Sequence, residues 1–194
     1  MTDWEQNYVE GHTPWNKGKA SPPMMEWVSQ NQPQGRALVP GCGVGHDVVM
    51  LVDAGLDAHG LDIAPTAIAM AQAAYPDQAN RFVLGDLFAT PLEWQGSFDF
   101  VFEHTCLCAL PPEWRTRYET AAYQLLKTGA QLVGIWFINP EMDPDETGPP
   151  FGISVSELSA LFDESRWQVI EDRVPEIGYD GRVGRERLRV LRKL

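Results

Sequence analysis

The sequence predicts a three-layer α/β fold in which a seven-stranded, mostly parallel sheet lies between helices. Short apolar runs alternate with helix-like stretches along most of the chain, which is typical of strands joined by crossover helices. The first apolar run ends in a glycine-rich turn, as the first strand of a ligand-binding α/β fold does. The last two apolar runs predict an antiparallel pair at one edge of the sheet.

Five apolar runs predict the parallel strands, because strands covered on both faces are almost continuously apolar. They are residues 36–40, 58–63, 81–84, 98–102 and 132–138. The runs that predict the antiparallel edge pair are residues 167–174 and 187–191. Charges alternate from Arg182 to Arg189, which predicts a solvated edge that discourages the addition of further strands.

Helix signals fall between these runs. An alanine-rich stretch that Pro76 stops and a later stretch that prolines open both favour helices. Ser154 and Glu157 have the spacing of a capping box. The predicted helices cover residues 23–30, 46–54, 64–75, 112–126 and 154–163.

Length and composition limit the class of protein. The 194 residues suit one domain, which we predict over residues 1–194. A net charge of −12 disfavours a broad basic face for nucleic acid. No apolar run approaches the ~20 residues of a membrane span, and the N-terminus lacks a secretory signal. Three cysteines, an odd and sparse number, predict reduced thiols in a cytoplasmic protein.

Two segments lie outside the alternation of strands and helices. Residues 1–34 are rich in Trp, Pro and Gly and contain one predicted helix. Residues 139–152 combine prolines, glycines and acidic residues. A structureless insertion of that length predicts a lid over a functional site.

The stretch from Val39 to Asp47 is the most informative part of the chain. Its glycines let the backbone turn tightly and approach a ligand, and the next helix points its N-terminal amides at the same space. Asp62 ends the second strand about 20 residues later, where it can accept hydrogen bonds from two ribose hydroxyls. Asp86 follows the third strand, where it can accept from the exocyclic amine of an adenine.

Each of these features also has a purely structural alternative. The glycines would suit a turn without a ligand, Asp62 would suit the N-cap of the next helix, and Asp86 would suit a turn. Three ligand-compatible features after three successive strands favour a binding site, because ligands bind at the carboxyl edge of an open parallel sheet.

The glycine spacing separates the possible nucleotide sites. A dinucleotide site prefers a third glycine where this chain has His46, and a phosphate-binding loop requires a Gly-Lys-Ser/Thr sequence that is absent. A nicotinamide-dependent oxidoreductase stays open as an alternative. The spacing Gly41-x-Gly43-x-Gly45 instead resembles that of class I methyltransferases, which use S-adenosylmethionine.

The resemblance covers nearly the whole chain. Gly11-His12-Thr13-Pro14-Trp15-Asn16-Lys17-Gly18, residues 35–47, residues 98–104, Cys108-Ala109 and residues 148–151 resemble the thiopurine S-methyltransferase family. Within it they resemble most the plant-type thiol, thiocyanate and halide methyltransferases. The resemblance implies a Rossmann-like fold and S-adenosylmethionine-dependent methyl transfer. The implied acceptor is a small soft nucleophile, such as a thiol, hydrosulfide, thiocyanate or halide, that displaces the cofactor sulfur in line.

The family pattern also implies which residues contact the two ligands. Residues 1–34 would close over the cofactor, Asp62 would hold the ribose, and Asp86 and Leu87 would meet the adenine. The implied cofactor contacts are Trp4, Tyr8, Trp15, Gly41, Asp62, Asp86, Leu87 and His104. The implied acceptor contacts are Trp15, His104, Leu107, Cys108 and Phe151.

Two positions depart from the plant-type branch, which usually has Trp in place of Tyr8 and Tyr in place of His104. An imidazole and a phenol differ in hydrogen bonding and charge, so the change at His104 bears on the choice of acceptor. We predict His104 as the catalytic residue, a general base for thiols whose ordinary pKa of ~8.5 leaves them protonated at neutral pH.

The other titratable groups are given no catalytic role. Cys106 and Cys108 are too few to hold zinc and suit small buried positions, so we predict no metal site. Arg182 or Arg185 is a candidate contact to an anionic acceptor. The histidines that suit surface or turn positions are His12, His46 and His59.

The predicted partners are the cofactor and a small-molecule methyl acceptor, with no nucleic acid and no membrane. We predict a monomer. A protein that binds S-adenosylmethionine without catalysis stays open as a second alternative, because a binding pocket and an active pocket share the same motifs.

Overall fold

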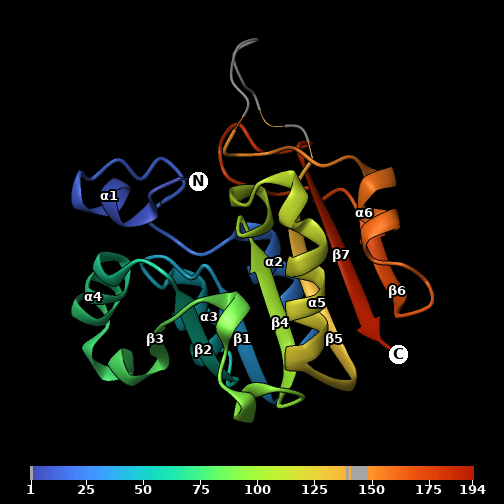
Figure 1. Cartoon of the computed structure of the whole chain (residues 1–194), viewed down its shortest axis with the longest axis horizontal. Coiled ribbons are helices and arrows are strands. Elements are labelled where there is room, and N and C mark those ends of the chain that lie inside the picture. Colours follow the sequence, from blue (N-terminus) through green and yellow to red (C-terminus); the bar gives the residue numbers. More distant parts are fainter. Residues whose placement is uncertain (1, 139, 141–147) are drawn as a thin grey trace.

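A seven-stranded sheet organises the chain. The computed structural model describes residues 2–138, 140 and 148–194, and places the strands in the order β3-β2-β1-β4-β5-β7-β6 (Figure 1). The strands are β1 (Arg36–Pro40), β2 (Asp57–Asp62), β3 (Phe82–Leu84), β4 (Phe98–His104), β5 (Leu126–Phe137), β6 (Trp167–Arg173) and β7 (Glu186–Lys193). Among the described residues, no helix is long and apolar enough to cross a membrane.

The strand directions confirm the predicted fold class. Strands β1 to β5 run parallel, and β7 is antiparallel to both β5 and β6. The order reverses between β1 and β4, which are neighbours in the sheet although β2 and β3 intervene in the sequence. In open α/β sheets, ligands bind at the carboxyl ends of the strands beside such a switch point.

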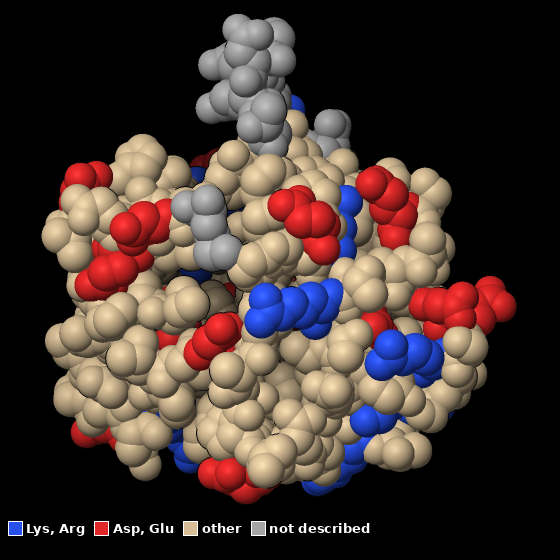
Figure 2. All heavy atoms as spheres, viewed as in Figure 1, with Lys and Arg blue, Asp and Glu red and all other residues tan. Residues whose placement is uncertain are grey.

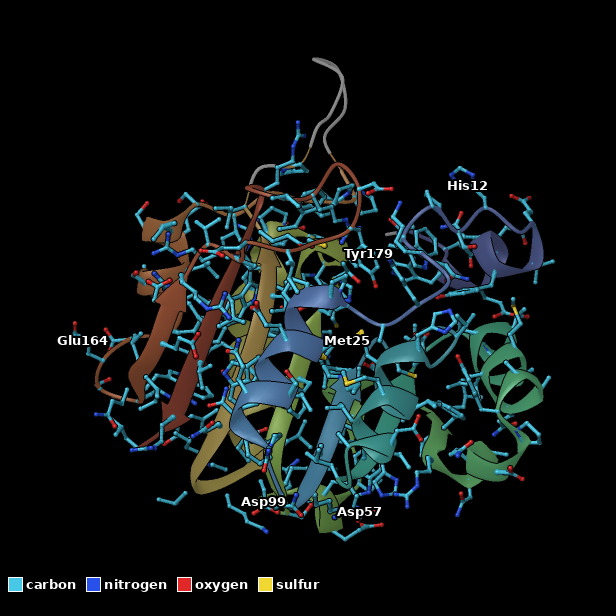
Figure 3. The ribbon with its side chains drawn as sticks, turned by 180° about the vertical axis from the view of Figure 1, so that it is seen from behind. His12, Met25, Asp57, Asp99, Glu164 and Tyr179 are labelled. Carbon is cyan, nitrogen blue, oxygen red and sulfur yellow. The ribbon has the colours of Figure 1, made fainter. Side chains whose placement is uncertain are left out.

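Helices cover both faces of the sheet. One face carries α2 (Pro22–Asn31) and α3 (His46–Asp53), which lie in front of the strands in Figure 3. The other face carries α5 (Arg115–Leu125) and α6 (Val155–Leu161), in front in Figure 1. Each face has its own core of buried apolar side chains, and α4 (Pro65–Ala74) contributes to the same core as α2 and α3.

One helix in the N-terminal segment was not predicted. Asp3 caps α1 (Trp4–Val9) by accepting a 3.0 Å hydrogen bond from the Gln6 N–H. Glu5 then accepts from both the N–H and the hydroxyl of Thr66, which fixes α1 beside α4 (Figure 1). A helix of six residues is too short to show an amphipathic repeat, so its cap was the only local signal.

Several predicted boundaries are wrong by a few residues. Helix α5 begins at Arg115 after a 3₁₀ turn over Pro112–Trp114, and β5 begins directly after it at Leu126 instead of at residue 132. Leu126 is buried, but the three residues after it, Lys127-Thr128-Gly129, are exposed, so this part of β5 lacks the apolar signal of a buried strand. The capping box at Ser154 and Glu157 is confirmed.

The prediction of a solvated edge at residues 182–189 is wrong. Strand β7 lies inside the sheet between β5 and β6, and the edge strand is β6. Glu186 and Arg189 are 2% and 3% exposed. Arg189 is buried with partners, 3.0 Å from an Asp172 oxygen and 3.1 Å from the Ser159 hydroxyl. Alternating charge along a strand cannot distinguish paired buried groups from solvated ones.

Most of the predicted lid lies outside the described residues. The structure describes Pro140 and residues 148–152 of the predicted lid at 139–152. The N–H of Phe151 donates a 2.7 Å hydrogen bond to the Cys108 carbonyl, which ties this part of the chain to the loop after β4.

Candidate active site

A large cavity opens at the carboxyl ends of the parallel strands. Its volume is about 910 Å³, near the upper end of the ~300–1,000 Å³ typical of small-molecule sites. Residues that follow β1, β2, β3 and β4 line it, together with the N-terminal segment and the loop before β7. Figure 2 shows a recess on this face, with acidic and basic side chains at its rim.

Asp62 joins the cavity to the glycine-rich turn. Its Oδ2 accepts a 2.8 Å hydrogen bond from the Gly43 N–H, and its Oδ1 accepts a 2.9 Å bond from the Ala64 N–H. Burial raises the pKa of this carboxyl, and the amide hydrogen bonds from Ala64 and Gly43 only partly offset that effect. A carboxylate accepts along about four directions, more than the three backbone amides of Gly43, Ile63 and Ala64 use. The N-cap of α4 is Ala64, so Asp62 is not itself the helix cap.

The glycine turn is packed closely on two sides. Gly41 and Gly43 have φ of +62° and +53°, in the left-handed region that favours glycine. A Cβ at Gly43 would lie 2.8 Å from the Tyr8 hydroxyl oxygen, and one at Gly41 would lie 3.2 Å from Cys106 Sγ. The turn therefore has no room for side chains between the N-terminal segment and the loop after β4.

Asp86 shapes the next part of the wall. Its Oδ1 accepts a 2.8 Å hydrogen bond from the Phe88 N–H and caps a short 3₁₀ turn over Leu87–Ala89. Both Asp86 and Leu87 line the cavity. Ile63 lines it as well and is 55% exposed, and the sequence analysis missed it. An apolar residue directly after the acid that ends β2 was the available signal.

Aromatic side chains from the N-terminal segment cover the cavity. The rings of Trp4 and Trp15 meet edge to face with their centroids 5.2 Å apart, and Trp15 and Tyr8 do so at 5.7 Å. The Trp15 indole N–H donates a 3.0 Å hydrogen bond to the Tyr8 hydroxyl. Burial, and then the charge of Asp62, raise the pKa of Tyr8, so its phenol stays neutral.

The loop after β4 forms the wall opposite this cover. Thr105 has a φ of +65°, which is rare for a β-branched residue and marks local strain. Buried Glu103 holds this loop, because its Oε1 accepts from the N–H groups of Cys106 (2.8 Å) and Leu107 (3.2 Å). Burial raises the pKa of the Cys108 thiol to about 12, with a further contribution from Glu103. Burial also raises the pKa of the Cys106 thiol. Both cysteines therefore line the cavity with neutral side chains.

His104 lies behind that wall. It is 8% exposed, and its Nδ1 is 3.1 Å from Asp47 Oδ2. Its Nε2 is 4.0 Å from a Glu186 oxygen, and its ring stacks on Tyr179 with centroids 5.7 Å apart. Burial by itself would raise the pKa of Asp47, but the hydrogen bond and charge of His104 lower it. Asp47 also accepts a 2.7 Å hydrogen bond from the Ser21 N–H, so the cluster links α2, α3 and β4.

The structure brings most of the predicted site residues to one cavity. Those that line it are Trp4, Tyr8, Trp15, Gly41, Asp62, Asp86, Leu87 and Cys108. Three predicted residues, His104, Leu107 and Phe151, are not among the described residues that line it. Leu107 is 1% exposed and belongs to a core on one face of the sheet.

This arrangement matches a known family. The sequence profile of thiopurine S-methyltransferases matches residues 1–177. The chain belongs to the thiopurine S-methyltransferase family. It is therefore an S-adenosylmethionine-dependent methyltransferase, and this membership favours methyl transfer over the nicotinamide-dependent alternative.

Two plant methyltransferases align with almost the full chain. Probable thiol methyltransferase 2 of Arabidopsis thaliana is 32% identical over 188 residues, which cover 95% of this chain and 82% of that protein. Thiocyanate methyltransferase 1 of Brassica oleracea is 32% identical over 198 residues, covering 98% and 84%.

A solved methyltransferase shares the fold. The crystal structure of Burkholderia thailandensis 1,6-didemethyltoxoflavin-N1-methyltransferase, which contains S-adenosylhomocysteine, superposes with a TM-score of 0.75. The superposition covers 98% of this chain and 85% of that one, at 17% identity.

The residues of the cavity fit S-adenosylmethionine. A cofactor with a ribose, an adenine and a charged sulfur requires hydroxyl and amine acceptors at one end and a water-poor, neutral wall at the other. The 7% exposed Asp62 carboxylate and the Asp86 carboxylate, which caps a 3₁₀ turn, are acceptors of the kind that such a cofactor requires. Beside these two acids lies the tight turn at Gly41 and Gly43, whose backbone carries no side chains. Within the described part of the chain, no group of three or more His, Cys, Asp or Glu side chains is arranged to hold a metal ion.

Proposed function

We propose that this methyltransferase transfers a methyl group to a small soft nucleophile of the thiol, hydrosulfide, thiocyanate or halide class. The observation that carries the proposal is one cavity lined by two kinds of group. Asp62 and Asp86 line it from the ends of β2 and β3, and Cys106 and Cys108 line it from the loop after β4. The thiol and thiocyanate methyltransferases at 32% identity support the same acceptor class.

The first role of the chain is to bind the cofactor. We assign the ribose hydroxyls to the free lone pairs of Asp62, and the adenine to Asp86 with Leu87 and Ile63 beside it. Gly41 brings bare backbone close to the amino-acid part. The cover formed by Trp4, Tyr8 and Trp15 closes over the bound molecule and excludes water.

The second role is to hold the acceptor in line. When bound, S-adenosylmethionine supplies a methyl carbon on a positively charged sulfur. The loop Thr105–Cys108 and the aromatic cover would orient the incoming atom toward that carbon. Transfer to an anionic acceptor would neutralise both the acceptor and the sulfonium. Exclusion of water by these walls favours a step in which charge disappears.

His104 has two candidate roles. The predicted role is a general base for neutral thiols, for which Nε2 would have to reach the acceptor. Its position behind the wall, between Asp47 and Glu186, favours a positioning role in which the imidazole holds α3 against β4. Anionic acceptors need no base, so the two roles differ in their effect on thiols and halides.

The proposal extends to the setting of the reaction. We propose a monomer in a reducing, cytoplasmic environment. The three cysteines, Cys42, Cys106 and Cys108, form no disulfide with one another and support the reducing environment.

The test is a panel of acceptors with product detection by mass spectrometry. Thiocyanate, iodide, hydrosulfide and small neutral thiols are each incubated with S-adenosylmethionine, and calorimetry measures binding of the cofactor separately. We expect cofactor binding in the micromolar range and methylated product from at least one acceptor. Binding without product from any acceptor would instead support the non-catalytic alternative.

A further inference from the structure

We infer that Arg182 selects a methyl acceptor that is negatively charged when it binds. This inference rests on the proposed function and deepens it, because it names the charge of the acceptor and the residue that recognises it. From the sequence alone, Arg182 was one of two candidate contacts. Four observations of the structure support the assignment: its place in the cavity, its burial, its contacts and the charges around it.

The sheet order places Arg182 at the end of the cavity away from Asp62 and Asp86, the two acids that we assign to the cofactor. Arg182 lies over the ring of Phe137, which ends β5, whereas Asp86 follows β3. The ends of β2, β1 and β4 lie between those two strands. At about 4.8 Å per strand, the ends of β2 and β5 are roughly 14 Å apart. The glycine turn and the Thr105–Cys108 loop lie between them, where methyl transfer would occur.

The side chain of Arg182 is built into the wall. It is 11% exposed, and its guanidinium carbon is 4.8 Å from the ring centroid of Phe137 and 5.6 Å from that of Tyr179. Figure 3 shows Tyr179 at the edge of the sheet opposite Asp57 and Asp99, which is the carboxyl edge where the cavity opens. The Tyr179 hydroxyl donates a 2.8 Å hydrogen bond to the Lys19 carbonyl, so the ring under the guanidinium is itself held in place.

The hydrogen bonds of Arg182 leave donors for a ligand. One terminal nitrogen donates to Glu186 Oε1 at 3.2 Å, and Glu186 is 2% exposed. A guanidinium has five N–H donors, and this bond to Glu186 uses one of them. The bond to Glu186 fixes the plane of the Arg182 guanidinium, and Arg182 lines the cavity. The planar set of N–H donors of a guanidinium suits planar or diffuse anions.

Net charge explains why a local cation is needed. The chain carries a charge of −12, so its overall field repels anions. Lys17, Arg182 and Arg185 line the cavity, together with the acids Asp62, Asp86 and Asp180. The positive charge that an anionic acceptor meets inside the cavity therefore comes from these three basic side chains.

The experiment compares Arg182→Met and Arg182→Lys with a matched control, Arg187→Met. Methionine keeps much of the apolar stem of the arginine and removes the charge. Lysine keeps the charge but loses the planar set of N–H donors. Arg187 is an arginine of β7 that pairs with Asp172 and is not among the described residues lining the cavity. Thiocyanate and a neutral thiol, β-mercaptoethanol, serve as acceptors at pH 7. Calorimetry of thiocyanate binding in the presence of S-adenosylhomocysteine gives a readout without turnover.

We expect Arg182→Met to weaken thiocyanate binding by roughly ten- to hundredfold and to raise the KM for thiocyanate by the same factor, the size of a lost hydrogen bond to a charged group. For the neutral thiol, the KM should change less than about threefold, and so should the affinity for S-adenosylmethionine. Arg182→Lys should fall between, and Arg187→Met should match the wild type.

Two results would overturn the inference. One is unchanged thiocyanate binding in Arg182→Met, and the other is a loss of S-adenosylmethionine affinity, which would assign Arg182 to the cofactor. If the wild-type enzyme methylates no acceptor, the proposed function fails, while thiocyanate binding still decides the role of Arg182.

Discussion

The backbone N–H of Gly43 donates a 2.8 Å hydrogen bond to Asp62 Oδ2, and this bond connects the turn after β1 to the end of β2. The same carboxylate accepts from the N–H of Ala64 at the start of α4. Asp62 is therefore a structural acceptor and a cavity residue together. This structural role differs from the helix N-cap that the sequence set against ribose binding, because the N-cap of α4 is Ala64. It leaves acceptor directions on the carboxylate for a ligand.

Replacement of Asp62 should weaken the binding of the cofactor. In Asp62→Ala the ribose hydroxyls lose their acceptor, and we expect S-adenosylmethionine to bind ~1–3 kcal/mol less tightly. Calorimetry measures the change. Asp77→Ala is the control, because Asp77 is an exposed acid outside the described cavity wall. An Asp62→Ala variant that binds the cofactor as the wild type does would contradict the ribose assignment.

A methyl group at Gly43 should displace the aromatic cover. A Cβ there would lie 2.8 Å from the Tyr8 hydroxyl oxygen, and we expect Gly43→Ala to lose on the order of 1–3 kcal/mol of stability beyond the backbone strain. Gly96→Ala is the matched control, because Gly96 has a similar φ of +60° and nothing within 4 Å of its Cβ position. Urea unfolding measures both variants.

The double variant Gly43→Ala/Tyr8→Phe tests the cause of that loss. Removal of the hydroxyl leaves the ring carbon Cζ of residue 8 at 4.0 Å from the new Cβ, which is an ordinary contact distance. We expect the double variant to recover much of the loss in stability. No recovery would show that the strain lies in the turn and not in its contact with the cover.

Glu103 should make stability depend on pH. Burial raises the pKa of its carboxyl from 4.5 to about 7, despite the hydrogen bonds from Leu107 and Cys106 that favour the charged form. The folded state then binds the proton more tightly than the unfolded state, so stability falls as pH rises from about 4.5 to about 7. The fall for this group is on the order of 3 kcal/mol.

Urea unfolding between about pH 4.5 and pH 8 isolates this contribution. Glu103→Gln keeps a side-chain oxygen for the Cys106 and Leu107 amides but cannot titrate, so the wild type should lose stability relative to it as pH rises. Glu93→Gln, at an exposed acid, should follow the wild type. If the free energies of unfolding of the wild type and Glu103→Gln changed in parallel with pH, the Glu103 carboxyl would not titrate in this pH range.

The sequence predicted the sheet and the acids of the site because both depend on local patterns. A buried parallel strand is apolar and short. An acid directly after such a strand lies at the carboxyl edge of the sheet, because the strand direction alone decides that position. The interior position of β7 was not predicted because the pairing of its charged side chains is not visible in the sequence. Glu186 pairs with Arg182, four residues away, and lies 4.0 Å from His104, and Arg189 pairs with Asp172. The left-handed backbone of Thr105 was not predicted because a β-branched residue disfavours that conformation. It is imposed by the contacts of the loop after β4.

The position of His104 also could not be predicted from the sequence, because the sequence does not show which side chains surround it. The family resemblance implied that His104 contacts both the cofactor and the acceptor, but in the structure it pairs with Asp47 and is not among the described residues that line the cavity. A positioning role predicts that His104→Phe lowers the kcat for iodide and for a neutral thiol by similar factors, because a buried Asp47 left without its partner distorts α3 and the turn before it. Breaking a buried pair typically costs ~3–5 kcal/mol of stability.

The double variant His104→Phe/Asp47→Asn decides between the two roles of His104. It removes the unpaired charge, so under the positioning role it should regain stability and recover both activities in part. Under the role of general base, His104→Phe would lose thiol methylation and keep iodide methylation, and the second substitution would restore nothing to the thiol. The ratio of the two rates is the decisive quantity, because a loss of folded protein lowers both rates equally, whereas loss of a proton acceptor lowers only the rate for the thiol.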